Sequence, residues 1–331
     1  MNTCPPYNDR GPYGPGEQKR WTVAVDLAGS PTSSSSPPPT PDPHAAMPRS
    51  GPFAGHLHFD RTVTPVLRTD VDVDAYVRRG SSRLEVDTAL LGVEAPLGPQ
   101  ERLALGVLQR LESAAIAESR SMLSTTTGNE ARITAFLATW MVDRFWQSRA
   151  LRDVLTGDAP TVRPVPRSRP RPVHVLRRIH VDRLQPLLSP LWTGLGGEAV
   201  PAGHMARMAI QEASLQAALL LLAQRLDGEA RRVLELVAER HQASVDFFTA
   251  EAIARVTRSR REAAAARLVL ALGSPLAGGG VPDPDLSAAL RILGETAADR
   301  AALRRARFEI TRLLPGPDLP DPHLSSLPRG G

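Results

Sequence analysis

Residues 205–226 read MARMAIQEASLQAALLLLAQRL, and residues 229–258, after Asp227-Gly228, read EARRVLELVAERHQASVDFFTAEAIARVTR. In residues 229–258 apolar residues recur every three or four positions, which is the periodicity of an amphipathic helix. Residues 205–226 contain the longest apolar run of the chain, Ala217–Ala223. The intervening Asp-Gly pair is typical of a tight turn. The sequence therefore predicts an antiparallel pair of long helices over about 205–226 and 229–258.

A second pair of helices is predicted earlier in the chain. An amphipathic pattern over about 98–122 predicts one long helix, the turn-forming residues 124–129 end it, and a further helix follows over about 133–154. Two more helices are predicted near the C-terminus, over about 261–272 and, as one continuous helix, over about 286–314. Two long hairpins joined by one long connection are typical of a four-helix bundle. We therefore expect an all-α fold, with a four-helix bundle and additional C-terminal helices.

The rest of the chain is predicted to contribute less to the core. Residues 1–55 are rich in Pro, Gly and Ser, a composition that cannot bury a core, so we expect a disordered tail there. Residues 56–97 contain short β-prone stretches such as Val71–Val77, and we expect them to form a weakly structured extension. The helical domain then covers residues 98–315, and residues 316–331 form a C-terminal tail.

Composition and charge exclude several classes of protein. The 331 residues carry a net charge of only +5, and Lys19 is the one lysine among 40 basic residues, which indicates skewed composition rather than an electrostatic role. We therefore expect no nucleic-acid partner. The single cysteine, Cys4, excludes a disulfide framework and a cysteine-based metal cluster. The longest apolar run, Ala217–Ala223, is far shorter than the roughly 20 residues that span a bilayer, and the N-terminus lacks the pattern of a signal peptide, so we expect a cytoplasmic protein.

Polar residues are predicted at the middle of the bundle. In an antiparallel hairpin, two residues equally distant from the turn lie at the same depth. Glu112 and Arg144 are equally distant from the first turn, and Glu212 and His241 are equally distant from the second to within one residue. The sequence therefore predicts one polar side chain from each of the four helices at one depth.

The segments around these positions resemble the ferritin-like superfamily, and within it the carboxylate-bridged di-iron oxidases and acyl-carrier-protein desaturases. The resemblance covers about residues 101–315 and rests on these segments: Leu111-Glu112, ATWMVDRFWQ (138–147), IQE (210–212), AERH (238–241) and DFF (246–248). It implies a bundle with one Glu on the first and third helices and Glu-x-x-His on the second and fourth, which together bind two irons.

The ligand pattern that this resemblance implies is altered in the present chain. The predicted mid-bundle cluster has six members: Glu112, Arg144, Gln147, Glu212, His241 and Ser244. Arg144-x-x-Gln147 and His241-x-x-Ser244 stand where the resemblance implies Glu-x-x-His. A guanidinium keeps its proton in a protein, so Arg144 would place a permanent positive charge where iron should bind. We therefore expect a salt-bridged core in place of the metal centre, and no cofactor.

An alternative interpretation keeps a metal. It is an altered mononuclear iron site built on Glu212, His241 and either Asp143 or Glu239. The first interpretation predicts a binding or scaffold protein, and the alternative predicts a metal-dependent oxidoreductase that acts on a lipid or a secondary metabolite. A third hypothesis is regulatory: the arginine-rich segment 163–183 and the N-terminal tail would recruit an acidic or nucleic-acid partner.

The partner of the bundle is not specified by the sequence. Bundles of this kind often self-associate, so the expected partners are a second copy of the chain, another protein or a small molecule.

Other polar and aromatic residues have simpler interpretations. Long helices usually carry glutamates on solvated faces, so four of them are expected at the surface: Glu118, Glu130, Glu235 and Glu239. A set of aromatic residues at helical spacing is expected to pack in the core rather than to line a tunnel: Trp140, Phe145, Trp146, Phe247 and Phe248.

Overall fold

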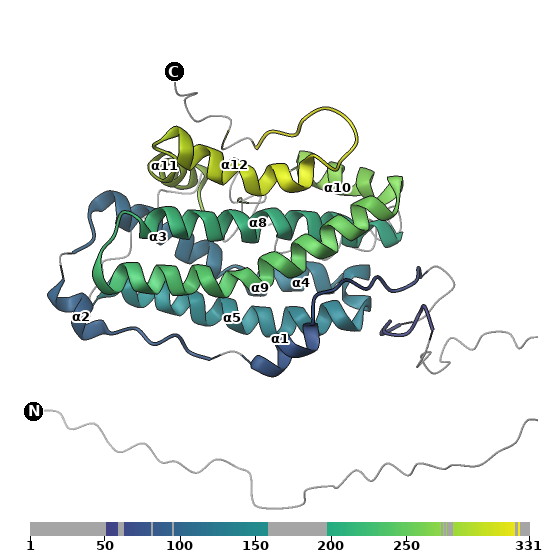
Figure 1. Cartoon of the computed structure of the whole chain (residues 1–331), viewed down its shortest axis with the longest axis horizontal. Helices are drawn as coiled ribbons and strands as arrows, with labels where there is room; N and C mark the ends of the chain where they lie inside the picture. Colours follow the sequence, from purple (N-terminus) through teal and green to yellow (C-terminus); the bar gives the residue numbers. More distant parts are fainter. Residues whose placement is uncertain are drawn as a thin grey trace, which may run out of the picture. The chain divides into compact units, whose positions relative to one another are not determined.

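The described part of the chain is helical (Figure 1). The computed structural model describes residues 51–58, 63–80, 82–94, 96–157, 197–272, 274, 276, 281–321 and 324. No β-strand occurs in these ranges, so the prediction of an all-α fold is confirmed at the level of class. Residues 1–50 of the expected tail, the arginine-rich segment 163–183 and most of the expected C-terminal tail lie outside the described residues.

Five helices form the central bundle: α3 (Pro99–Glu112), α4 (Ala115–Leu123), α5 (Ala131–Thr156), α8 (Val200–Ala223) and α9 (Gly228–Arg258). The long helices α5 and α9 begin and end within about two residues of the predicted bounds, whereas α8 begins earlier than predicted. Pro201 lies in the first turn of α8, where its missing amide donor leaves no helical hydrogen bond unmade. Gly228, at the α8–α9 connection, has a φ of 59°, a left-handed value that favours glycine.

The predicted single helix over 98–122 is wrong in one respect. It is divided into α3 and α4 by a turn at Ser113 and Ala114. The Ser113 hydroxyl donates to the carbonyl of Arg110 at 2.8 Å, and the Ala114 amide donates to the Leu111 carbonyl at 3.1 Å, three rather than four residues back. Serine side chains compete with the helical pattern in this way, which explains why α3 ends at Glu112.

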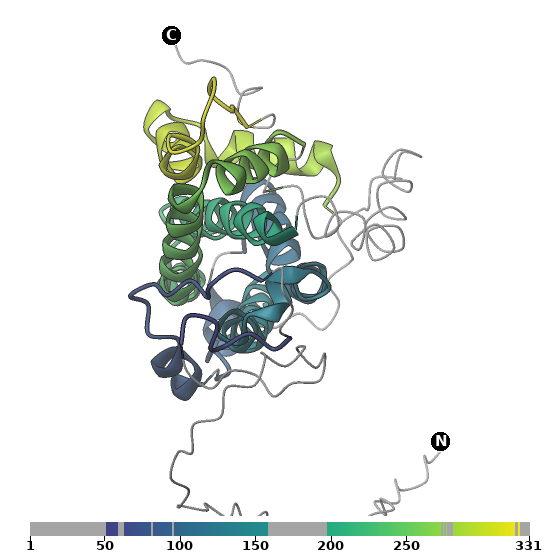
Figure 2. The same ribbon diagram turned by 90° about the vertical axis from the view of Figure 1, so that its right-hand side faces the viewer.

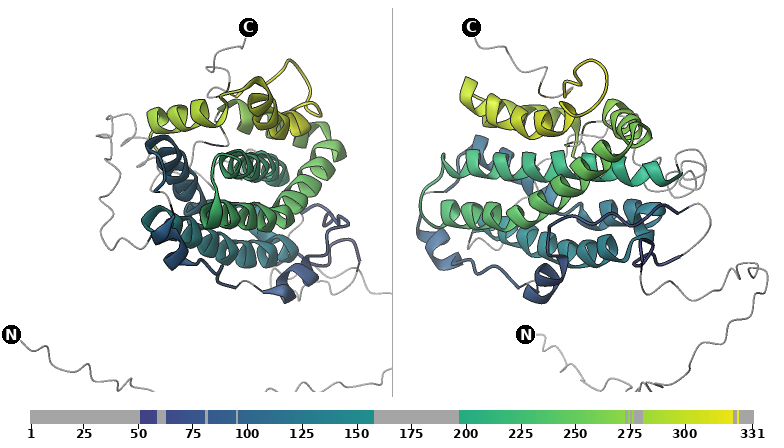
Figure 3. Two further views of the ribbon diagram at one scale, coloured as in Figure 1. Left: turned by 60° about the vertical axis from the view of Figure 1, so that its left-hand side comes forward. Right: turned by 45° about the vertical axis from the view of Figure 1, so that its right-hand side comes forward.

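Helix α8 runs through the middle of the described helices (Figures 2 and 3). It packs against α3, α9, α10 and α12, and its buried residues lie on every side of the helix. A helix that is apolar all round is typical of a core position, which explains why the sequence of α8 lacks a polar face. The three helices nearest the C-terminus cover it: α10 (Arg260–Leu272), α11 (Asp283–Leu293) and α12 (Ala297–Thr311).

The prediction of one continuous helix over 286–314 is wrong. Helix α11 ends before Gly294, and α12 begins after Thr296. The Thr296 hydroxyl accepts a hydrogen bond from the Asp299 amide, and the Asp299 carboxylate accepts one from the Thr296 amide. This capping box, together with the helix-ending glycine before it, explains the division.

Two short helices replace the β-prone extension expected over 56–97. Helix α1 covers Val73–Arg79 and helix α2 covers Thr88–Val93. Asp72 accepts a hydrogen bond from the Ala75 amide, and Asp87 caps α2 in the same way. An N-cap aspartate can start a helix whose own residues have β propensity, so the prediction from propensity was wrong here.

The aromatic residues divide between core and surface. Trp140, Phe247 and Phe248 are buried together, and Tyr76 of α1 stacks on the same cluster through Phe136 at 4.6 Å between ring centroids. Phe145 was expected in the core but is 54% exposed. It directly follows the inward-facing Arg144, and a helical step of about 100° turns it outward.

No helix in the described ranges combines the length and the apolar character needed to cross a bilayer.

Candidate functional site

Four charged side chains meet at the middle of the bundle, and each comes from a different helix. Glu112 comes from α3, Arg144 from α5, Glu212 from α8 and His241 from α9, and each is 0% exposed. The structure thus brings together the four residues that the sequence placed at one depth. We call these four residues the charge ring.

Arg144 joins the two carboxylates of the charge ring. Its Nη1 donates to Oε1 of Glu212 at 2.9 Å, and its Nε lies 2.8 Å from Oε2 of Glu112. The second contact is an ion pair without hydrogen-bond alignment, because neither of its two atoms has a hydrogen-bond partner within the described structure. Nη2 donates to the carbonyl of Leu111 at 2.9 Å. The guanidinium is therefore held on three sides by protein groups.

His241 joins the same two carboxylates from the opposite side. Its Nδ1 lies 3.0 Å from Oε2 of Glu212, and its Nε2 lies 2.7 Å from Oε1 of Glu112. Because an ionised carboxylate only accepts hydrogen bonds, both ring nitrogens donate when the ring carries both protons. Burial opposes this charged form, but Glu112 and Glu212 outweigh it and raise the pKa of His241 to about 9. The geometry and the pKa agree on an imidazolium at neutral pH.

The charges alternate around the ring. Each carboxylate contacts Arg144 through one oxygen and His241 through the other, so two negative groups alternate with two positive groups. Burial opposes ionisation of Glu212, but the neighbouring Arg144 and His241 charges lower its pKa to about 2. The Ser244 hydroxyl, 2.7 Å from Oε2 of Glu212, adds a further donor. The site is thus a buried but charge-balanced network, the arrangement in which buried ions are tolerated.

The turn between α3 and α4 supplies one acceptor of this network. Because α3 ends at Glu112, the Leu111 carbonyl accepts from the Ala114 amide and from Nη2 of Arg144, at 3.1 and 2.9 Å. In an uninterrupted helix this carbonyl would bond the amide four residues on. The turn between α3 and α4 therefore allows the Leu111 carbonyl to accept a hydrogen bond from the buried guanidinium.

Gln147 and Ser244 also lie in the buried part of the cluster, at 2% and 4% exposure. Oε1 of Gln147 has no hydrogen-bond partner among the described residues. An unpaired buried acceptor costs about 1–3 kcal/mol, so Gln147 does not stabilise the core through this atom.

Of the residues of the alternative mononuclear metal site, Glu212 and His241 are in contact, whereas Glu239 does not join them. Glu239 is exposed, because it lies two residues before His241 and therefore on the opposite side of α9. Asp143 is half-buried and accepts a hydrogen bond from the Tyr76 hydroxyl of α1. Within the described ranges, no three His, Cys, Asp or Glu side chains are arranged to hold a metal ion.

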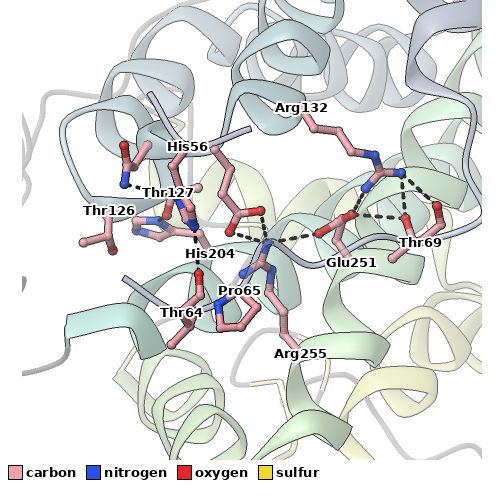
Figure 4. A network of polar contacts seen from close by, with 12 residues as sticks. His56, Thr64, Pro65, Thr69, Thr126, Thr127, Arg132, His204, Glu251 and Arg255 are labelled. Carbon is pink, nitrogen blue, oxygen red and sulfur yellow. Dashed lines mark hydrogen bonds and ion pairs between the residues drawn. The ribbon is translucent and has the colours of Figure 1, made fainter. Parts of the chain in front are cut away.

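A second buried ionic network was not predicted (Figure 4). Nη2 of Arg255 donates to both carboxylate oxygens of Glu130, at 2.8 and 2.9 Å, and to Oε2 of Glu251 at 3.2 Å. Arg132 pairs with Glu251 and also donates to Oγ1 of Thr69 at 2.7 Å. The expectation of a surface position for Glu130 is wrong, since it is 4% exposed. The network connects the start of α5, the end of α9 and the segment before α1.

The other three glutamates expected at the surface differ among themselves. Glu235 and Glu239 are exposed. Glu118 is half-buried: Oε1 accepts from Nε2 of Gln211 at 2.5 Å, while Oε2 is enclosed without a hydrogen-bond partner in the described structure. Burial raises the pKa of Glu118 more than Arg144 and Arg207 lower it.

Comparison of the chain with protein-family models, with curated proteins and with solved structures finds no match.

Proposed function

We propose that this chain is a ferritin-like helical-bundle protein in which the charge ring replaces a di-iron centre, and that it acts as a binding or scaffold protein. The observation that carries the proposal is the guanidinium of Arg144, fully buried between Glu112 and Glu212. In ferritin-like di-iron proteins, carboxylates from facing helices surround the two metal ions. Here the corresponding carboxylates surround an arginine and a histidine.

The contacts that the two carboxylates already make within the protein support this proposal. Both oxygens of Glu112 and both oxygens of Glu212 contact Arg144 or His241 within 3.0 Å. A divalent cation between these carboxylates would lie next to a guanidinium that cannot lose its proton. It would also compete with the imidazolium for the same lone pairs. The site therefore favours the metal-free state, and a binding or scaffold role needs no chemistry at mid-bundle.

The spacing of the cluster provides a direct test. Four substitutions, Arg144→Glu, Gln147→His, His241→Glu and Ser244→His, would produce Glu-x-x-His on both α5 and α9 at buried positions. We expect the unmodified protein to bind no stoichiometric iron after anaerobic incubation with ferrous iron, and the fourfold variant to bind about two irons per chain, as the family pattern implies. Elemental analysis of the desalted protein measures both.

The single variant Arg144→Gln is the matched control. It removes the positive charge without adding ligands, so it should remain free of iron, and circular dichroism establishes that each variant is folded. Stoichiometric iron in the unmodified protein would refute the proposal and favour the metal-dependent oxidoreductase.

A further inference from the structure

A small cleft opens at the surface where α3, α4 and α5 meet. Its volume is about 110 Å³, and part of the charge ring lies at its base. The lining residues that matter here are Glu112, Ile116, Met141, Phe145, Arg149 and Arg152. Because α5 supplies four of these side chains at helical spacing, they form one stripe along that helix.

One part of the cleft wall is apolar and exposed. Phe145 is 54% exposed and Ile116 is 47% exposed, and they face the hollow from α5 and α4 respectively. Met141, one turn before Phe145, is half-buried and completes the wall. Single exposed apolar side chains are common, but two large ones on either side of a hollow form a surface suited to an apolar group.

The rim of the cleft is basic. Arg152 is exposed and forms no ion pair within the described structure. Nε of Arg149 lies 3.4 Å from Oδ1 of Asp153, an i,i+4 pair with a half-exposed arginine, and such pairs are weak. Glu112 at the base is balanced by Arg144 and His241, so it leaves no net negative charge to oppose an anion at the rim.

We propose that this cleft binds a small carboxylate with a branched aliphatic or aromatic body. The body would lie between Ile116 and Phe145, and the carboxylate would pair with Arg152 and Arg149. A cavity of about 150 Å³ holds a benzene ring, so a cleft of about 110 Å³ that is open at one side suits a group of phenyl size or smaller. Guanidinium and carboxylate groups match each other in planar geometry. This inference rests on the proposed binding role and assigns it a ligand class.

A pair of probes that differ only in charge tests the proposal. Phenylacetate and 2-phenylethanol are titrated against the full chain at low salt by ligand-observed NMR. We expect phenylacetate to bind about fivefold more tightly, as two exposed ion pairs would give. Arg152→Glu should abolish that preference, and Phe145→Ala should weaken both probes at least threefold.

Matched controls lie on α12, outside the cleft. Phe308 is 60% exposed and Arg305 is exposed, so Phe308→Ala and Arg305→Glu repeat the same chemical changes elsewhere. Neither should alter the binding of either probe. Equal binding of the two probes, binding of neither, or equal effects of control and cleft variants would overturn the proposal.

Two further outcomes distinguish rival explanations. If Phe145→Ala dissociates a dimer in analytical ultracentrifugation and leaves probe binding unchanged, the cleft belongs to an interface between copies of this chain, and the proposal fails. Iron content is measured on the same preparations. Iron bound by the unmodified protein would refute the proposal of a metal-free charge ring, but not the proposal that the cleft binds a carboxylate. Failure of both probes to bind would refute the proposal for the cleft, but not the proposal of a metal-free charge ring.

Discussion

Replacing Arg144 with methionine should destabilise the protein strongly. Methionine fills a similar elongated volume but carries no charge, so the packing change is small. The variant loses the contacts of Arg144 to Glu212, Glu112 and the Leu111 carbonyl, at 2.9, 2.8 and 2.9 Å. Two buried carboxylates then share one imidazolium. Removing one partner of a buried ion pair costs about 3–5 kcal/mol, and we expect about 4 kcal/mol here.

The assay is equilibrium unfolding in urea at pH 6, followed by circular dichroism. A loss of about 4 kcal/mol lowers the unfolding midpoint by about 2 M when the slope is about 2 kcal/mol per molar urea. The double variant Arg144→Met with Glu112→Gln provides the decisive comparison. It removes one charge of each sign and leaves Glu212 paired with His241, and the new amide oxygen still accepts from Nε2 of the imidazolium.

The double variant should therefore be more stable than the single variant by at least 1 kcal/mol, which is a non-additive coupling typical of contacting charges. A double variant that is less stable than the single one would refute the reasoning, because it would mean that Arg144 acts through packing alone. An Arg144→Met variant as stable as the unmodified protein would also refute it.

The buried ionic groups should make the stability of the protein depend on pH. Because the pKa of His241 is raised from 6.5 to about 9, its contribution to stability is complete below pH 6.5 and is lost as the pH rises through 9. Glu212, whose pKa is lowered from 4.5 to about 2, contributes above pH 4.5 and loses this contribution as the pH falls towards 2. As the pH rises from 6 to 10, the urea concentration at the unfolding midpoint should fall more steeply for the unmodified protein than for His241→Gln. Parallel plots of midpoint against pH for the two proteins would contradict this prediction. In the second network, Arg255→Met should lower the free energy of unfolding by about 3–5 kcal/mol. Arg231→Ala, which removes the exposed i,i+4 pair with Glu235, should leave the urea midpoint unchanged. Equal effects of the two substitutions would contradict the buried position of Arg255.

The common depth of the charge-ring residues could be predicted, because it depends mainly on how many residues separate each of them from the nearest turn. Helical rise is constant, so counting from a turn places Glu112 level with Arg144 and Glu212 level with His241. The details of contact could not be predicted in this way. That Arg144 uses the Leu111 carbonyl depends on the turn at Ser113, and apolar periodicity continues across that turn without a visible break.

Two helix boundaries and one buried pairing also differ from the sequence-based expectation. Helix α1 was missed because Val71–Val77 has β propensity, although Asp72 is a standard N-cap residue. The division before α12 was missed although Thr296 and Asp299 have capping-box spacing. The burial of Glu130 depends on Arg255, which is 125 residues away in sequence, and a single sequence does not show such a pairing.

The composition of α8 gives the charge ring a role beyond stability. Leucine, alanine and methionine side chains cover α8 on all sides, so apolar burial alone discriminates weakly between alternative alignments of the bundle. Sliding α5 along its axis by one turn, about 5.4 Å, would carry Arg144 out of reach of both carboxylates and leave buried charges unpaired. A single polar position can fix the register of packed helices in the same way. The charge ring thus favours the native register of α5 against α3, α8 and α9 over an alignment shifted by one turn.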